Sequence, residues 1–215
     1  MKPKPNTVLA VFVFVVATWV IFSAPASAQV GKGLIDLNVA SEAELGALPN
    51  MTPVLVKAFV ERRPFATIAE ANAYLLGQKL TEMQLTELYG KAFIHVNLNT
   101  GTREEILLIP GAGPRMAREF AEYRPWKTWA QFDKEIGKYV GQPETDRLKK
   151  YVFIPVKLNT GTDEDFLSIP GAGPRMTHEF KEYRPWKTKE QFEKEIGKYV
   201  GAKEVARFWR YMVIE

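Results

Sequence analysis

The chain has 215 residues, 46% of them hydrophobic, so it holds enough apolar material for a substantial packed core. It contains no cysteine, which excludes disulfide bonds and thiolate metal sites. Its formal net charge of +4 excludes the strong, nonspecific electrostatic field of a highly basic nucleic-acid-binding protein.

The first 28 residues are predicted to be a secretory signal peptide. Two lysines open the chain, residues 8–22 are apolar apart from Thr18, and Ala26 and Ala28 put small residues at the cleavage-determining positions. An uncleaved membrane anchor is the alternative, but this run is shorter than the roughly 20 residues that span a bilayer. We therefore expect cleavage before Gln29, a periplasmic or secreted protein, and a mature net charge of +2 after loss of the two lysines.

Internal repetition dominates the rest of the chain. Residues 98–141 match residues 158–201 at an offset of 60, with 34 of 44 positions identical. A more divergent copy lies upstream at an offset of 61, where Leu37-Asn38 aligns with Leu98-Asn99. The repetition predicts three units of about sixty residues. These are a first unit at 29–96, a second at 97–156 and a third at 157–215.

Each unit is expected to contain two helical hairpins. Capping-box patterns predict the start of the first and third helices. They begin at Ser41, Thr102 and Thr162 for the first helix, and at Thr67, Thr128 and Thr188 for the third. The second helix of the second unit is predicted to run from Pro114 to the Arg124-Pro125 stop, because a residue before proline is pushed out of the α region. No stretch alternates with period two, so we expect an all-α fold without a sheet.

The segment Ile-Pro-Gly-Ala-Gly-Pro-Arg-Met occurs twice, at 109–116 and at 169–176. Its glycines permit the positive φ angles that a tight reversal between two helices requires. The proline that follows suits the first position of a helix. Backbone N–H groups at the bend and at the helix N-terminus are then expected to point outward together, which favours an anion, above all a phosphate.

The run from Leu98 to Thr128 resembles the helix-hairpin-helix domain of the ComEA type, found in exported competence proteins that hold DNA outside the inner membrane. The resemblance covers the second and third units well and the first in outline. It implies that the hairpin amides hold a backbone phosphate of double-stranded DNA without reading its sequence. Carried over position by position, this role falls on Gly111, Ala112, Gly113, Arg115 and Arg118, and on Gly171, Ala172, Gly173, Arg175 and His178.

The first unit departs from this pattern. Where the other units have Gly-Ala-Gly-Pro-Arg, it has Asn50-Met51-Thr52-Pro53-Val54, so both glycines and the arginine are missing. Close approach of a phosphate is not expected there. The first unit is interpreted as a copy used for packing or for binding a partner.

Other residues are interpreted as structural. His95 and His178 are expected to be lone surface histidines rather than metal ligands. The aromatic residues that flank the Arg-Pro stops are expected to pack between hairpins rather than to stack on bases. They are Tyr123, Trp126, Tyr183 and Trp186. No nucleophile in a recognisable catalytic context is present, so we expect no enzymatic activity, cofactor or small-molecule substrate.

Two hypotheses remain from the sequence. Two intact hairpins with arginines favour an exported protein that binds duplex DNA nonspecifically. The low net charge and the altered first hairpin favour an interaction module at or near the inner membrane. The extrinsic subunit U of photosystem II is similar in fold to the ComEA-type domain and acts in this second way.

Overall fold

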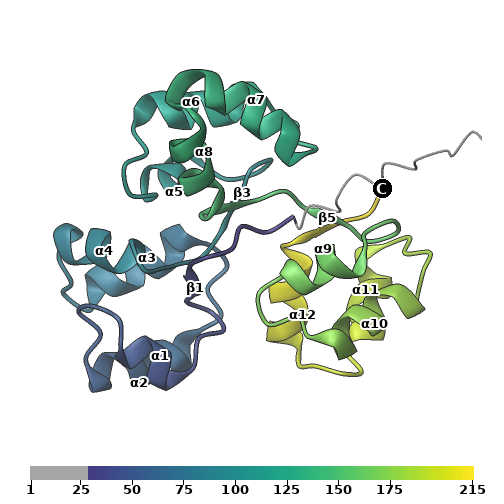
Figure 1. Cartoon of the computed structure of the whole chain (residues 1–215). Coiled ribbons are helices and arrows are strands. Elements are labelled where there is room, and N and C mark those ends of the chain that lie inside the picture. The colour runs from purple at the N-terminus through teal and green to yellow at the C-terminus, as the bar shows by residue number, and fades with distance from the viewer. Residues whose placement is uncertain (1–28) are drawn as a thin grey trace, which may run out of the picture.

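The computed structural model describes residues 29–215, and the predicted signal peptide lies outside the described residues. The described chain is mostly helical, with twelve helices and six very short strands. Figure 1 shows the helices gathered in three groups that follow one another along the chain. None of the helices in residues 29–215 has the length and apolar character that a bilayer crossing requires.

The same order of elements, a strand, four helices and a strand, occurs three times. The first set comprises β1 (Ile35–Asp36), α1 (Glu42–Gly46), α2 (Pro53–Arg62), α3 (Ile68–Gly77), α4 (Glu82–Tyr89) and β2 (Ala92–Phe93). The second comprises β3 (Val96–Asn97), α5 (Arg103–Leu107), α6 (Pro114–Glu122), α7 (Trp129–Val140), α8 (Gln142–Lys149) and β4 (Val152–Phe153). The third comprises β5 (Val156–Lys157), α9 (Asp163–Ser168), α10 (Pro174–Glu182), α11 (Lys189–Ile196), α12 (Ala202–Trp209) and β6 (Met212–Val213).

The expectation that no sheet forms was wrong. The first and last strands of each set pair in parallel, as β1 with β2, β3 with β4, and β5 with β6. Each strand has only two residues, so no alternation of apolar and polar residues was there to be seen in the sequence. The pairing brings the entry and exit of each four-helix set side by side.

The predicted helix starts are confirmed. Ser41, Thr102 and Thr162 cap α1, α5 and α9 in complete capping boxes. Thr67, Thr128 and Thr188 also cap their helices, but the reciprocal contact differs from a capping box. The side chain three residues on instead accepts a hydrogen bond from the residue before the cap, as Gln131 does from the Lys127 amide at 2.9 Å.

The motifs shared by all three units bind each other. The Asn99 side chain accepts a hydrogen bond from Trp126 N and donates one to Trp126 O, at 2.6 and 3.0 Å. Arg124 donates to the carbonyls of Leu98 and Gly101, at 2.7 and 2.5 Å. Equivalent bonds join Asn159, Arg184 and Trp186 in the third unit, and Asn38, Arg63 and Phe65 in the first. The Leu-Asn and Arg-Pro segments are therefore structural.

The aromatic residues at these corners pack as expected. Trp126 and Trp186 are each 1% exposed, and each indole N–H donates to a backbone carbonyl of the preceding helix, Phe120 O or Phe180 O. Tyr123 and Tyr183 are half-buried beside them. The prediction that these side chains are packing groups rather than exposed base platforms is confirmed for the tryptophans.

A buried polar cluster joins the first set of elements to the last. His95 is 2% exposed, so the expectation of a surface position was wrong for it, whereas the His178 side chain is 70% exposed as expected. Nδ1 of His95 lies 3.4 Å from Oδ2 of Asp36, and the Tyr211 hydroxyl lies 3.2 Å from the same oxygen. Arg210 donates to the His95 carbonyl at 2.8 Å. The residues around His95 come from β1 and from the segment just after α12. Both are distant from His95 in the sequence, so its burial could not be predicted from its neighbours in the chain.

The segment at 29–31 joins the first unit to the second at β4. Val30 forms an isolated antiparallel bridge with Phe153, and Gly31 N donates to Val152 O at 3.2 Å. Val30 packs with the apolar core of the third unit, while the cores of the first and second units are continuous. The three groups of helices are thus held together by both main-chain and side-chain contacts.

Candidate anion-binding hairpins

The two glycine bends have nearly the same backbone. Gly111 has a φ of 80° and Gly171 a φ of 74°, in the left-handed region that favours glycine. Gly113 and Gly173, at −96° and −91°, are extended and do not need glycine for their backbone angles. In the first unit Asn50 takes the place of Gly111 with a φ of 64°, since asparagine tolerates this region. The bend is therefore kept in all three units.

Within each bend, the middle amide is hydrogen-bonded and the two glycine amides are free of partners among the described residues. Ala112 N donates to Ile109 O and Ala172 N to Ile169 O, both at 2.9 Å. The amides of these two predicted site residues are therefore not available to an anion. Both alanines are also buried, at 9% and 7% exposed. The amides of Gly111 and Gly113 have no hydrogen-bond partner among the described residues. Gly111 is exposed and Gly113 is half-buried, and the same holds for Gly171 and Gly173.

The helices that follow the bends start without a cap. Gly113 and Gly173 occupy the N-cap positions of α6 and α10, and neither offers a side-chain acceptor. The amides of Arg115 and Met116 in the first turn of α6 have no partner within the part of the chain that the structure describes. In the first unit Thr52 caps α2 by accepting from Leu55 N at 3.3 Å. Two helix starts are therefore open to an anion and the third is closed by its own threonine.

A pair of tyrosines holds basic side chains beside each open helix start. The Arg115 guanidinium lies 4.9 Å from the Tyr139 ring centre, and Nζ of Lys138 lies 4.5 Å from that of Tyr123. The two tyrosine hydroxyls are 2.8 Å apart. This hydrogen bond, together with burial and the Glu119 carboxylate, raises the pKa of Tyr139 to about 12, so the hydroxyl stays protonated near neutral pH.

The third unit repeats this arrangement. Arg175 lies 5.5 Å from the Tyr199 ring, Lys198 lies 5.1 Å from the Tyr183 ring, and the two hydroxyls are 2.8 Å apart. At the corresponding positions of the first unit stand Val54, Gly77, Gln78 and Arg62, so the whole arrangement is lost there with the open helix start.

Lys138, Tyr139, Lys198 and Tyr199 were not among the predicted site residues. The segment Lys-Glu-Ile-Gly-Lys-Tyr-Val-Gly, identical at 134–141 and 194–201, was the available signal.

The remaining predicted residues lie further along the helices. The Arg118 side chain is 66% exposed and lies 3.3 Å from Oε1 of Glu119, a carboxylate that is itself buried. His178 faces solvent, with Nε2 4.0 Å from Glu182. Lys138 is paired with Glu135 at 2.5 Å. Each candidate site thus combines cations with nearby carboxylates, and its affinity for an anion must come mainly from the free amides and Arg115 or Arg175.

Each bend also borders the first unit. A cavity of about 270 Å³ separates Gly111 from α3 and α4, and one of about 420 Å³ lies between Gly171 and residues such as Val39 and Arg63. Arg147 and Arg207 approach Gly111 and Gly171 closely enough that an added Cβ would lie 3.1 and 2.8 Å from a guanidinium nitrogen. The bends are therefore flanked by protein, but no residue of the first unit pairs with their amides.

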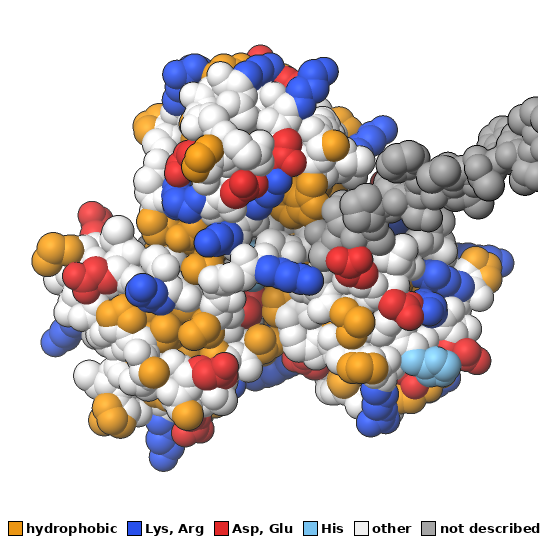
Figure 2. Space-filling view, in the orientation of Figure 1, with side chains coloured by type: hydrophobic (Ala, Val, Ile, Leu, Met, Phe, Trp, Pro, Cys, Tyr) orange, Lys and Arg blue, Asp and Glu red, His pale blue; other side chains and the backbone are white. Residues whose placement is uncertain are grey.

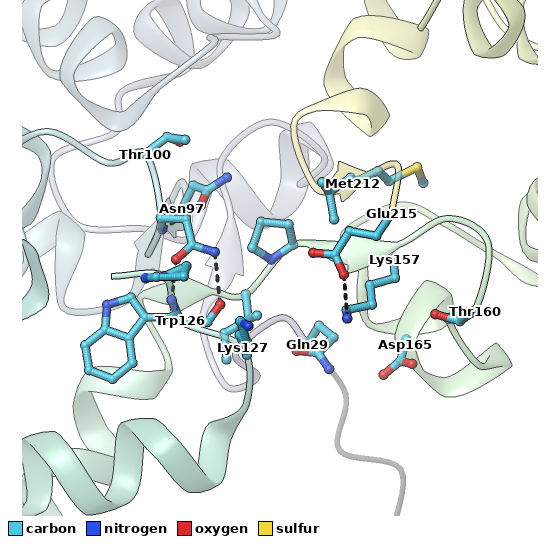
Figure 3. A pocket seen from close by; sticks show the side chains of 16 residues that line it. Gln29, Asn97, Thr100, Trp126, Lys127, Lys157, Thr160, Asp165, Met212 and Glu215 are labelled. Carbon is cyan, nitrogen blue, oxygen red and sulfur yellow. Dashed lines mark hydrogen bonds and ion pairs between the residues drawn. The ribbon is translucent and has the colours of Figure 1, made fainter. Parts of the chain in front are cut away.

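Another cleft, of about 380 Å³, lies between the second and third units (Figure 3). Polar side chains such as Asn97, Lys127 and Thr160 line it, and Lys157 forms an ion pair with Glu215 at 2.5 Å within it. It contains none of the predicted site residues. Within residues 29–215 no group of three or more His, Asp or Glu side chains is arranged to hold a metal ion.

Charges are mixed on the surface. Figure 2 shows lysine and arginine side chains interspersed with aspartate and glutamate on the face it presents. Comparison with protein-family models, with curated proteins and with solved structures found no match to this chain. Functional inference therefore depends on the geometry of the site.

Proposed function

We propose that this chain is an exported, sequence-nonspecific DNA-binding protein built from ComEA-like helix-hairpin-helix units. Its second and third units would grip backbone phosphates of duplex DNA. The observation that carries the proposal is the contrast between the units. The bend is present in all three, but only the second and third combine an uncapped helix start with an exposed arginine.

The chemistry of this site suits a phosphate better than a base. Free backbone amides and a helix N-terminus stabilise a compact negative charge, and they carry no pattern of donors and acceptors that distinguishes one base pair from another. Arginine adds a charge-assisted donor that matches a phosphate oxygen pair. Two such sites on one chain would hold one duplex at two points and make binding depend on salt.

A second candidate function is a protein-interaction module that binds no DNA. It is favoured by the balanced charge and by large apolar side chains that are exposed on the first unit, such as Val54 at 82% and Met83 at 73%. Under this alternative the glycine bends serve only to reverse the chain.

Titration of the mature protein into labelled duplex DNA at several salt concentrations tests the proposal. We expect affinity to fall with salt with a log–log slope of roughly −2 to −5, which corresponds to about −0.9 for each phosphate neutralised. Replacing both arginines, in an Arg115→Glu, Arg175→Glu variant, should abolish this binding.

A Lys57→Glu, Lys91→Glu variant is the matched control, because it makes the same change in net charge on exposed residues of the first unit. It should retain at least most of the affinity. Absence of binding at low salt, or an equal loss in both variants, would contradict the hairpin proposal and favour the interaction module.

A further inference from the structure

A basic cleft lies where α12 meets the first unit, on the other side of Arg207 from the Gly171 bend. Its volume is about 250 Å³. One side is formed by Arg62, Pro64 and Phe65, and the other by side chains of α12 and the residue just after it. None of the residues that line it is acidic.

Four cations line this cleft, and two of them are not neutralised by a direct carboxylate contact. Arg62 is paired with Glu70 at 2.8 Å, and the buried Arg207 is paired with Glu204. Arg210 instead donates to neutral oxygens, the His95 carbonyl and the Tyr211 hydroxyl, at 2.8 and 3.0 Å. Lys203 is exposed and makes no ion pair with any described residue. The charge of Arg210 also acts on the buried Asp36, so Lys203 is the cation of this cleft that has no carboxylate partner among the described residues. An anionic group beside Lys203, within reach of Arg210, would compensate that charge.

The remaining wall is apolar. Its accessible surface comes from Pro64 and Ala66 of the first unit, which lie beside the buried Phe65, and from Ala206 of α12. The Arg62 guanidinium lies 5.4 Å from the Phe65 ring, which places a planar cation at the edge of this wall. A flat apolar group would bury the exposed surface of Pro64, Ala66 and Ala206 while its anionic substituent faces Lys203 and Arg210.

The second unit lacks this chemistry at the matching positions of its own last helix. Pro143 and Asp146 stand where α12 has Lys203 and Ala206, so a lysine is missing and a carboxylate is added. The cleft thus combines a first-unit corner with side chains that are specific to α12.

We propose that this cleft is a binding site for a small organic anion, specifically a phosphate carried on a flat apolar ring. Arg207 of this cleft also donates to the Pro170 carbonyl beside the Gly171 bend. The proposed site nevertheless uses neither the free hairpin amides nor Arg115 or Arg175, so its occupation does not depend on the DNA-binding proposal. A free aryl or nucleoside phosphate and the terminal nucleotide of a nucleic acid both present this chemistry.

Three probes separate the contributions of charge and ring: phenyl phosphate, inorganic phosphate and phenol. Each is titrated into the mature protein, and binding is followed by backbone amide chemical shifts. Phenyl phosphate should bind at least about tenfold more tightly than either fragment, because it alone satisfies both walls. The shifts should centre on the amides of residues 65–66 and 203–210. Adenosine monophosphate and a short 5′-phosphorylated duplex then distinguish a free ligand from a strand end.

Lys203→Gln is expected to weaken phenyl phosphate about threefold to tenfold, since one charged donor is removed. Lys194→Gln, at an exposed lysine of α11 outside the cleft, should leave binding unchanged. The Arg115→Glu, Arg175→Glu variant should also bind phenyl phosphate normally, even if it has lost DNA. Equal binding of phenyl phosphate and inorganic phosphate, no effect of Lys203→Gln, or shifts centred on the hairpins would overturn the proposal.

Discussion

The hydroxyl of Tyr211 donates a hydrogen bond of 3.2 Å to Oδ2 of Asp36, a residue 175 positions earlier in the chain. The tyrosine is 1% exposed and the aspartate 6%, so the contact is shielded from water. Buried polar groups are stabilising only when they are paired, and this pair connects β1 to the segment just after α12. The contact therefore makes the stability of the first unit depend on the third.

Tyr211→Phe should destabilise the protein by about 1.5–3 kcal/mol, because it removes a hydrogen bond to a buried charged group without creating a large cavity. Urea unfolding followed by circular dichroism measures the change. Tyr89→Phe is the matched control, since Tyr89 is 2% exposed and its hydroxyl donates to the neutral side-chain oxygen of Asn72 at 2.9 Å. It should cost about 0.5–1.5 kcal/mol. An equal loss of unfolding free energy in the two variants would show that the hydrogen bond to Asp36 stabilises the fold no more than one to a neutral acceptor does.

Asp36 should make the fold sensitive to acid. Burial raises the pKa of its carboxyl, but the hydrogen bond and charge of His95, with smaller contributions from Asn38 N–H and Arg210, hold it below the usual 3.8. A carboxyl whose pKa is lower in the folded state stabilises the fold above its unfolded pKa. That contribution is lost as pH falls through the folded value.

The free energy of unfolding of the unmodified protein should thus decrease below about pH 4, and Asp36→Asn should flatten part of this decrease. Urea midpoints between neutral pH and pH 2 provide the measurement. Asp163→Asn is a suitable control, because the Asp163 side chain is 63% exposed. If Asp36→Asn and the unmodified protein lose stability in parallel, Asp36 does not carry the acid sensitivity.

Gly113→Asp combined with Gly173→Asp should separate folding from anion binding. Both glycines are extended, and a Cβ at either position would meet no atom within 4 Å. The new carboxylate can cap the helix as Thr52 does in the first unit. The free energy of unfolding should therefore stay unchanged or rise by about 0.3 kcal/mol per site. The same carboxylate would occupy the proposed phosphate position, so DNA affinity should be lost.

Thermal unfolding and the duplex titration check both halves of this prediction. Gly113→Ala with Gly173→Ala is the control, because it adds a Cβ without a charge or an acceptor. Undiminished DNA binding by the aspartate variant would show that the open helix starts are not where DNA is held.

Much of the helical architecture could be predicted because its signals are local. Thr102 and Glu105 lie within one turn, and Pro114 fixes the first position of its own helix, so the sequence around them is sufficient to place α5 and α6. The bend at Gly111 was predictable for the same reason. For Gly113 the position in the bend was predictable but the reason for glycine was not. Its φ is −96°, so what matters there is the absence of a capping side chain rather than a positive φ.

Contacts between distant segments could not be predicted in this way. The surface position expected for His95 was wrong because burial depends on Asp36 and Tyr211, and nothing near His95 in the sequence identifies them. The parallel strand pairs were missed because a strand of two residues is too short to show an alternation of apolar and polar side chains. Tyr139 beside Arg115 was also missed, since it comes from a different helix and only the identical repeat at 134–141 and 194–201 pointed to it.

The strand pairs also bear on how such a chain can grow. Because each parallel pair returns the backbone to the point where it entered, a duplicated segment of about sixty residues can be inserted at a junction such as Ile154 without stretching its neighbours. The contact between Asp36 and Tyr211 restricts such insertions, because a segment placed between the first and third units has to keep these two side chains within hydrogen-bonding distance.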